Sequence, residues 1–123
     1  MEKIVLIVDD NEDIIDLIEM EFEGQEYEVF RATGGHEALS ILKENPSISV
    51  VLSDTNMPEG NGEELLENIH KEGLRDNIIF YFITGDMDMD ATSVKEKGAD
   101  GIFSKPFNFD DMIEQVEGHM NKN

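Results

Sequence analysis

The sequence predicts an α/β fold in which a parallel sheet of five strands is covered by helices on both faces. Three observations lead to this prediction. Short apolar runs alternate with amphipathic stretches along the whole chain, several of the runs are apolar on both faces of the strand they would form, and Gly, Pro or Asn marks the boundaries between them. Fully apolar strands that alternate with helices are typical of parallel sheets that are buried on both sides.

Five apolar runs are short enough to be strands and are rich in Val, Ile, Phe or Tyr, as strands usually are. They are KIVLIV at 3–8, YEVFRA at 27–32, ISVVLS at 48–53, IIFYFI at 78–83 and GIFS at 101–104. Because crossover connections between parallel strands are right-handed, only a few topologies remain for these five.

The stretches between the runs carry apolar residues at helical spacing. The sets that share one helical face are Ile14, Leu17, Ile18 and Phe22, then Ala38, Leu39, Ile41 and Leu42, and finally Met112, Ile113, Val116 and Met120. Helix boundaries are marked as well. Gly24 follows the first helix, ENP at 44–46 ends the second, Gly73 and Gly98 follow a third and a fourth, and Asn108 is placed to cap the last.

Length and composition indicate one domain with an acidic surface. The chain has 123 residues, of which 29 are acidic and 9 basic, for a formal net charge of −20. One core is expected at this length, so we expect a single domain over 1–123 with no output domain. Nucleic acid and anionic membranes would repel such a chain. It contains no cysteine, and its first apolar run is too short for a signal peptide or a membrane span, so we expect a cytoplasmic protein without membrane insertion.

Polar residues follow the predicted strands at the point where each ends. Asp9 and Asp10 follow the first strand, Asp54 the third, Thr84 the fourth and Lys105 the fifth. Asp54 alone could be an ordinary turn residue, since Asp is common in turns. The carboxyl ends of parallel strands share one edge of the sheet, however, and open α/β sheets bind ligands at that edge. The sequence therefore predicts a functional site there.

The residue types at this edge indicate phosphoryl chemistry. Three carboxylates resist ionising together unless a cation neutralises them. Magnesium is the best candidate, because it prefers oxygen ligands and keeps waters that a phosphate oxygen can replace. A lysine and a threonine hydroxyl suit a dianionic phosphoryl group, and phosphoryl transfer depends mostly on positioning and charge neutralisation.

Four segments together resemble the response regulator receiver domain. They are LIVDDNEDI, VLSDTNMPEGNG, FITG and GADGIFSKPF, which correspond to the acidic pair, the phosphoacceptor loop, the threonine strand and the Lys-Pro strand of that family. The resemblance covers essentially the whole chain. It implies a doubly wound, flavodoxin-like sheet with strand order 2-1-3-4-5, and a phosphoacceptor signalling domain that catalyses only its own phosphorylation and dephosphorylation.

The resemblance also implies a role for each site residue. Asp54 would accept a phosphoryl group from a histidine kinase or a histidine phosphotransfer protein. Asp10, Asp54 and the backbone carbonyl of Asn56 would hold Mg²⁺, and Asp9 would orient a metal-bound water. The phosphorylated domain would then switch its interaction with a downstream protein target.

The remaining implied roles concern the phosphoryl group and the strand that follows it. Thr84 and Lys105 would bind phosphoryl oxygens, and Pro106 would shape the loop after the lysine. Asn56 and Asp86, two places after the phosphoacceptor and two after the threonine, would tune hydrolysis of the phosphoaspartate. The alternative for Asp86 is that it only begins a helix, where an acid is favourable.

One position departs from the family pattern. Three residues before the lysine the family usually has Tyr or Phe as its switch residue, whereas this chain has Ile102. Phe103 should point to the other side of the strand and belong to the core. The resemblance thus implies a signal that depends on the threonine loop rather than on an aromatic side chain.

Other site types fit the sequence less well. An EF-hand counted from Asp9 would need glycine at Ile14 and glutamate at Met20. An aspartyl-phosphate phosphatase would need a second acid where Asn56 stands, and the acids after the first strand would repel a flavin phosphate. The remaining alternative is a receiver-like adaptor that is never phosphorylated.

The three histidines are not expected to form a ligand set. His36, His70 and His119 fall on predicted helices away from the polar edge of the sheet. Solvated surface positions are therefore expected for them.

Overall fold

Five parallel strands form one sheet in the order β2-β1-β3-β4-β5, as the resemblance implied. The structure is a computed structural model that describes residues 2–55, 61–84, 98–105 and 107–121. The strands are β1 (Ile4–Val8), β2 (Glu28–Ala32), β3 (Val50–Asp54), β4 (Ile79–Thr84) and β5 (Gly101–Ser104).

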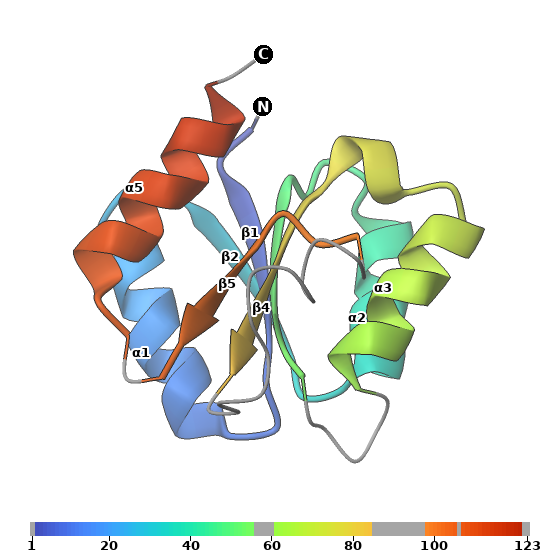
Figure 1. Ribbon diagram of the computed structural model, residues 1–123, viewed down its shortest axis with the longest axis horizontal. Coiled ribbons are helices and arrows are strands. Elements are labelled where there is room, and N and C mark those ends of the chain that lie inside the picture. Colours follow the sequence, from blue (N-terminus) through green and yellow to red (C-terminus); the bar gives the residue numbers. More distant parts are fainter. Residues whose placement is uncertain (1, 56–60, 85–97, 106, 122–123) are drawn as a thin grey trace.

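Helices cover both faces of this sheet, as predicted. Their bounds are α1 (Glu12–Glu23), α2 (Gly35–Glu44), α3 (Gly62–Lys71) and α5 (Phe109–Met120), with a short 3-10 helix, η1 (Arg75–Asn77). Figure 1 shows α1 and α5 on one side of the sheet and α2 and α3 on the other. The fourth helix predicted before Gly98 lies outside the described residues. Within those residues, none of the helices is both long enough and apolar enough to cross a bilayer.

Asparagine begins three of the helices. Asn11, Asn61 and Asn108 directly precede α1, α3 and α5, and each side-chain oxygen accepts a hydrogen bond from a backbone N–H in the first turn. Such caps satisfy donors that the helix leaves unpaired. Since Asn11 lies so close to the end of β1, α1 begins immediately beside the carboxyl edge of the sheet.

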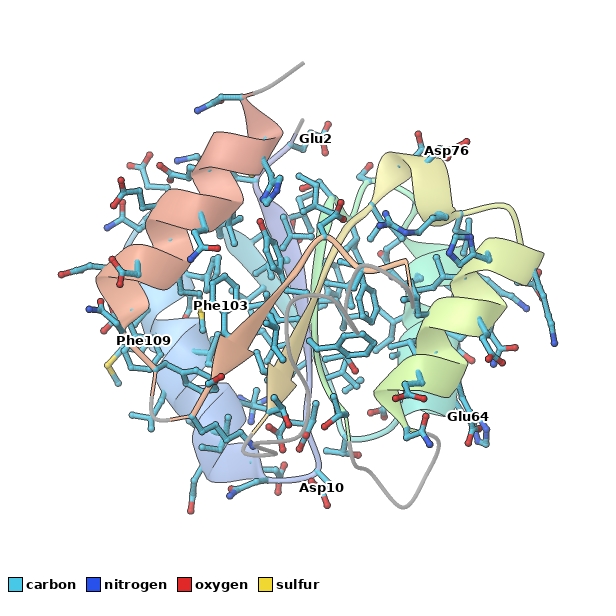
Figure 2. The ribbon with its side chains drawn as sticks, in the orientation of Figure 1. Glu2, Asp10, Glu64, Asp76, Phe103 and Phe109 are labelled. Carbon is cyan, nitrogen blue, oxygen red and sulfur yellow. The ribbon has the colours of Figure 1, made fainter. Side chains whose placement is uncertain are left out.

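The core consists of two layers, one on each face of the sheet. Successive side chains of a strand point to opposite faces, so Phe82 packs in the layer beneath α2 and α3, while Ile83 packs beneath α1 and α5. All five residues of β3 are buried, which explains why its sequence is almost continuously apolar. Figure 2 shows the side chains that fill the space between the sheet and its helices.

The same alternation separates Ile102 from Phe103 on β5. Ile102 is partly buried and packs against the layer of α2 and α3. Phe103 is buried in the opposite layer, where its ring stacks on Tyr81 with 4.8 Å between centroids. The prediction that Phe103 belongs to the core is confirmed.

The histidines follow the prediction in two cases of three. His36 on α2 and His70 on α3 are exposed. His119 on α5 is half-buried, and its Nδ1 contacts the hydroxyl of Tyr81. The expectation of a solvated position was wrong for His119, because the fully buried Tyr81 reaches across the layer to α5. Burial raises the pKa of the Tyr81 hydroxyl above its usual range.

Asp100, directly before β5, connects to β4 and to η1 at the amino edge of the sheet. Oδ2 of Asp100 accepts a hydrogen bond from the backbone N–H of Phe80 at 2.8 Å and lies 3.0 Å from Nη2 of Arg75. The guanidinium of Arg75 also donates to the carbonyl oxygen of Gly98. This network fixes where β5 starts, and through the register of the strand it sets the position of the residue that follows it, Lys105.

Candidate functional site

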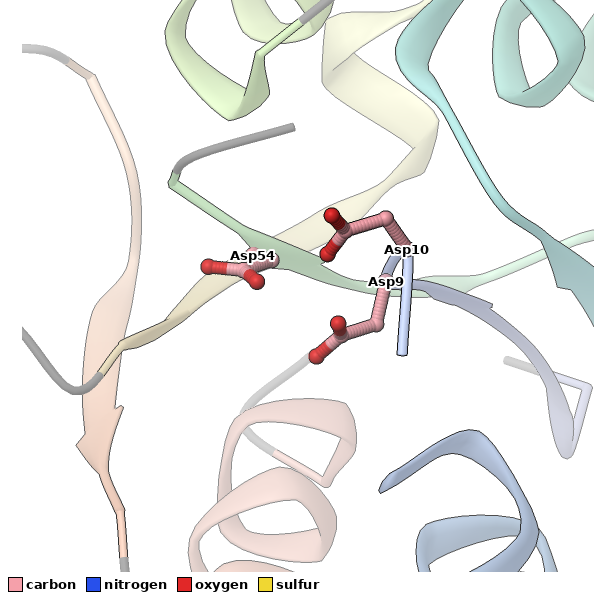
Figure 3. A group of neighbouring side chains, drawn as sticks. All are labelled: Asp9, Asp10 and Asp54. Atoms are coloured by element: carbon pink, nitrogen blue, oxygen red, sulfur yellow. The ribbon is translucent and has the colours of Figure 1, made fainter. Parts of the chain in front are cut away.

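Three carboxylates converge at the carboxyl edge of the sheet. Asp9 and Asp10 follow β1, and Asp54 is the last residue of β3, the strand beside it. One oxygen from each carboxylate can be chosen so that all three lie within 4.8 Å of one another. Figure 3 shows the side chains of Asp9, Asp10 and Asp54 next to one another at the ends of their strands. The sequence prediction that these residues come together is therefore confirmed.

Asp9 is the most enclosed of the three. It is fully buried, whereas Asp54 is 8% exposed and Asp10 is exposed. Burial raises the pKa of the Asp9 carboxyl above 3.8, and the charge of Asp54 adds to that rise. The backbone N–H of Asn11 and the ammonium of Lys105 oppose it. The carboxylate form of Asp9 is thus held at a cost in free energy.

Lys105 supplies the positive charge of the site. Its Nζ lies 3.3 Å from Oδ2 of Asp9 and 3.6 Å from Oδ2 of Asp54. The backbone N–H of Lys105 donates to the carbonyl oxygen of Thr84 at 2.8 Å, so the lysine is fixed directly to the end of β4. Among the described residues at this edge, one ammonium faces three carboxylates, which leaves an excess of negative charge.

Thr84 brings a hydroxyl to the same edge. It ends β4 and is 1% exposed, and its Oγ1 lies 3.1 Å from Oγ1 of Thr55. Thr55 was not among the residues predicted for the site. The only signal in the sequence is its position: it directly follows Asp54, which places its side chain on the opposite face of β3.

Gly62 was also missed, and it determines how closely α3 approaches the site. A Cβ at this position would lie 2.4 Å from the carbonyl oxygen of Asp54 and 3.1 Å from Oγ of Ser53. Only a residue without a side chain can therefore begin α3 at this place. In the sequence this glycine is indistinguishable from an ordinary turn residue.

The structure leaves several predicted roles without a test. Asn56, Asp86 and Pro106 lie outside the described residues, and their roles stay predictions. Ile102 pairs with Phe82 in the register of β4 and β5, while Thr84 pairs with Ser104. Ile102 therefore lies on the same face as Thr84, two residues earlier along its strand.

The donor set suits a hard divalent cation and a phosphoryl group. Carboxylate oxygens are the ligands that Mg²⁺ prefers, and Asp9, Asp10 and Asp54 bring three of them together beside Lys105, whose single charge cannot neutralise all three. An ammonium and a buried hydroxyl beside the carboxylates are donors for anionic oxygens. The site therefore fits Mg²⁺ by its own chemistry.

Comparison with known proteins agrees with this geometry. The family model described as response regulator receiver domain matches residues 5–117. The response regulator SaeR of Staphylococcus aureus is 32% identical over 113 residues, which are 91% of this chain and 48% of SaeR. The chain thus spans about half the length of the curated relatives it matches.

Solved structures with similar folds come from several organisms. A CheY-like response regulator receiver domain protein from Methanospirillum hungatei is 29% identical with a TM-score of 0.84, covering 99% of this chain and 96% of that one. CheY in a CheX-CheY-BeF3-Mg complex from Borrelia burgdorferi is 26% identical with a TM-score of 0.85, covering 97% and 90%. CheY4 of Vibrio cholerae is 26% identical with a TM-score of 0.84, covering 96% and 98%.

Proposed function

Because this chain belongs to the response regulator receiver domain family of two-component systems, we propose that Asp54 accepts a phosphoryl group from a phosphohistidine. The donor is a histidine kinase or a histidine phosphotransfer protein. The observation that carries the proposal is the gathering of three carboxylates and one ammonium at the carboxyl edge of the sheet. Asp54 ends β3, which lies in the sheet between β1, the strand before Asp9 and Asp10, and β5, the strand before Lys105.

The transfer breaks one bond and forms one. An oxygen of the Asp54 carboxylate attacks phosphorus, a P–O bond forms, and the P–N bond to the donor imidazole breaks with its electron pair leaving on nitrogen. Lys105 and Thr84 donate to the phosphoryl oxygens and stabilise the charge that spreads over them. Catalysis is thus positioning and charge neutralisation around Asp54.

Magnesium is the cofactor that the residues fit. Asp10, Asp54 and the backbone carbonyl of Asn56 would hold it, and Asp9 would act through a bound water. When bound, Mg²⁺ supplies positive charge against the phosphoryl oxygens. A relative supports this assignment, since CheY of Borrelia burgdorferi has been crystallised with CheX, BeF3 and Mg²⁺.

Receiver domains are signalling domains rather than classical enzymes, and they interact with kinases and with downstream proteins. We infer that phosphorylation of this chain switches its binding of a protein target in the cytoplasm. The signal passes by way of Thr84 and the face of β5 that carries Ile102. Asn56 and Asp86 set how long the phosphoaspartate lasts, because both side chains can orient the attacking water.

Phosphorylation itself is the direct test. Wild-type protein incubated with acetyl phosphate and Mg²⁺ should gain a phosphoryl increment in its intact mass, and chelation of Mg²⁺ should prevent the gain. Asp54→Asn should abolish the adduct while leaving the circular dichroism unchanged. Asp76→Asn, which removes an exposed acid from η1, is the matched control and should behave as wild type. An undiminished adduct in Asp54→Asn would refute the assignment, and absence of an adduct from wild type would favour the adaptor alternative.

A further inference from the structure

The hydroxyls of Thr55 and Thr84 are paired at the ends of β3 and β4. Their Oγ1 atoms are 3.1 Å apart, and the two residues are only 6% and 1% exposed. A buried hydroxyl that loses its hydrogen-bond partner costs free energy. We propose that Thr55 is a positioning residue whose hydroxyl holds Thr84 turned away from Asp54 and competes with the phosphoryl group for it. This inference rests on the proposed phosphorylation of Asp54.

The register of the strands places the two hydroxyls and the carboxylate on different faces. Asp54 pairs with Ile83, whose side chain packs beneath α1 and α5. Thr84 is one residue further and points to the face of α2 and α3. Thr55 is one residue beyond Asp54 and shares that face. Thr84 must therefore turn from Thr55 to reach a group on the Asp54 carboxylate, and the bond is lost whichever hydroxyl donates it.

Backbone hydrogen bonds hold the two threonines in place while this exchange occurs. The carbonyl oxygen of Thr84 accepts from the N–H of Lys105 at 2.8 Å, and that of Thr55 accepts from the N–H of Gly62 at 3.4 Å. Because both chain positions are fixed, the exchange takes place by rotation of the Thr84 side chain between discrete rotamers.

Competition of this kind lowers the apparent affinity for a phosphoryl group. A ligand that needs a minor conformation binds more weakly in proportion to the population of that conformation. The net free energy of one neutral hydrogen bond corresponds to a factor of about five. Removal of the Thr55 hydroxyl should therefore strengthen phosphoryl binding by about that factor.

Beryllofluoride, which mimics the phosphoryl group, tests the competition directly. Its affinity in saturating Mg²⁺, measured by ¹⁹F NMR, should be about fivefold tighter for Thr55→Val than for wild type. Thr55→Ser keeps the hydroxyl and should restore the wild-type value. In a Thr84→Val background, Thr55→Val should change nothing. If the single variant Thr55→Val, in which Thr84 is unchanged, bound beryllofluoride no more tightly than wild type, the inference would be overturned. The proposed function would stand, because the adduct itself still forms.

Thermal unfolding without metal or beryllofluoride provides a second readout. Thr55→Val, Thr84→Val and the double variant form a double-mutant cycle with wild type that measures the coupling between the two hydroxyls. We expect the double variant to lose less stability than the sum of the losses in the two single variants. Additive losses would overturn the inference even if phosphorylation occurs. Failure of wild type to bind beryllofluoride would overturn the proposed function and this inference together.

Discussion

Acidic side chains lie at both edges of the sheet, but they are matched with donors in different ways. At the amino edge, Asp100 accepts from the N–H of Phe80 and pairs with Arg75, so one carboxylate meets a backbone donor and a guanidinium. At the carboxyl edge, three carboxylates lie within 4.8 Å of one another and two of them share the ammonium of Lys105.

The difference separates an acid that stabilises the fold from acids that serve a site. A carboxylate with matched donors contributes to stability, and removing it leaves those donors unsatisfied. Carboxylates that outnumber the cations around them reduce stability until a ligand neutralises them. The balance of charge at each edge therefore supports the proposal that the carboxyl edge is the functional one.

The largest effect is expected where α3 meets the carboxyl edge. Gly62→Ala should lower the free energy of unfolding by about 3 kcal/mol, because the new Cβ would overlap the end of β3. Gly118→Ala is the matched control, since a Cβ on α5 meets nothing within 4 Å. That variant should be more stable by about 0.5 kcal/mol, given the higher helix propensity of alanine. Urea unfolding measures both, and similar results for the two would contradict the close approach of α3.

The second effect concerns the matched acid of the amino edge. Asp100→Ala should cost about 2 kcal/mol, because the N–H of Phe80, a residue with no exposed surface, loses its side-chain acceptor. Asp100→Asn keeps an acceptor oxygen and should cost less. Urea unfolding compares the two. If Asp100→Ala were as stable as wild type, the distinction between the two edges would fail.

The third prediction is a gain in stability rather than a loss. Asp9→Asn should raise the melting temperature in metal-free buffer at pH 7 by about 4 °C, the shift that roughly 1 kcal/mol produces in a domain of this size. The raised pKa of Asp9 means that the folded state binds its proton more tightly than the unfolded state does. Wild-type stability from this group therefore falls as pH rises from 3.8 through the folded pKa. The advantage of Asp9→Asn should disappear below pH 3.8.

A control must show that the stabilisation by Asp9→Asn comes from the crowded position of Asp9 and not only from the loss of one negative charge. Glu67→Gln removes one negative charge from the exposed surface of α3 and should give a smaller rise without the same pH dependence. Added Mg²⁺ should stabilise wild type more than Asp9→Asn, because binding to the folded state shifts the equilibrium. Equal pH profiles for Asp9→Asn and Glu67→Gln would show that the crowding at the site has no special effect.

The smallest effect is expected for charges that are matched but exposed. Arg31 lies 2.8 Å from Asp16 and 2.9 Å from Glu19 on the surface of α1. Surface ion pairs of this kind contribute little and are screened by salt. Arg31→Gln should cost about 0.5 kcal/mol at low ionic strength, and the difference from wild type should vanish in 1 M NaCl. A larger, salt-independent loss would mean that a surface ion pair contributes as much as the network around Asp100.

Most of the fold could be predicted because its signals are local. The apolar runs indicate the strands, boundary residues such as Gly24 and the cap Asn108 indicate where helices end or begin, and strand alternation alone assigned Phe103 to the core. The gathering of Asp9, Asp54 and Lys105 followed from one rule about the ends of parallel strands. The strand order itself came from the resemblance, since right-handed crossovers allow more than one order.

The parts that were missed depend on contacts between elements. Nothing in the sequence indicates that the Thr55 hydroxyl meets that of Thr84, because the pair depends on the register of β3 against β4. Gly62 resembles a turn glycine until the distance from α3 to Asp54 is known. His119 could not be distinguished from the surface residues of α5, because its partial burial depends on the Tyr81 side chain that extends from β4 to α5.

The placement of Lys105 after the last strand has a consequence for synthesis of the protein. A chain emerges from the ribosome from its amino end, so both buried aspartates of the site are made long before the lysine whose Nζ lies 3.3 Å from Asp9. A nascent chain that ends before residue 105 must hold these carboxylates without that ammonium. Translation of Lys105, directly after β5, therefore supplies the ammonium that the buried aspartates lack, and free cations in the surrounding solution would help shorter nascent chains most.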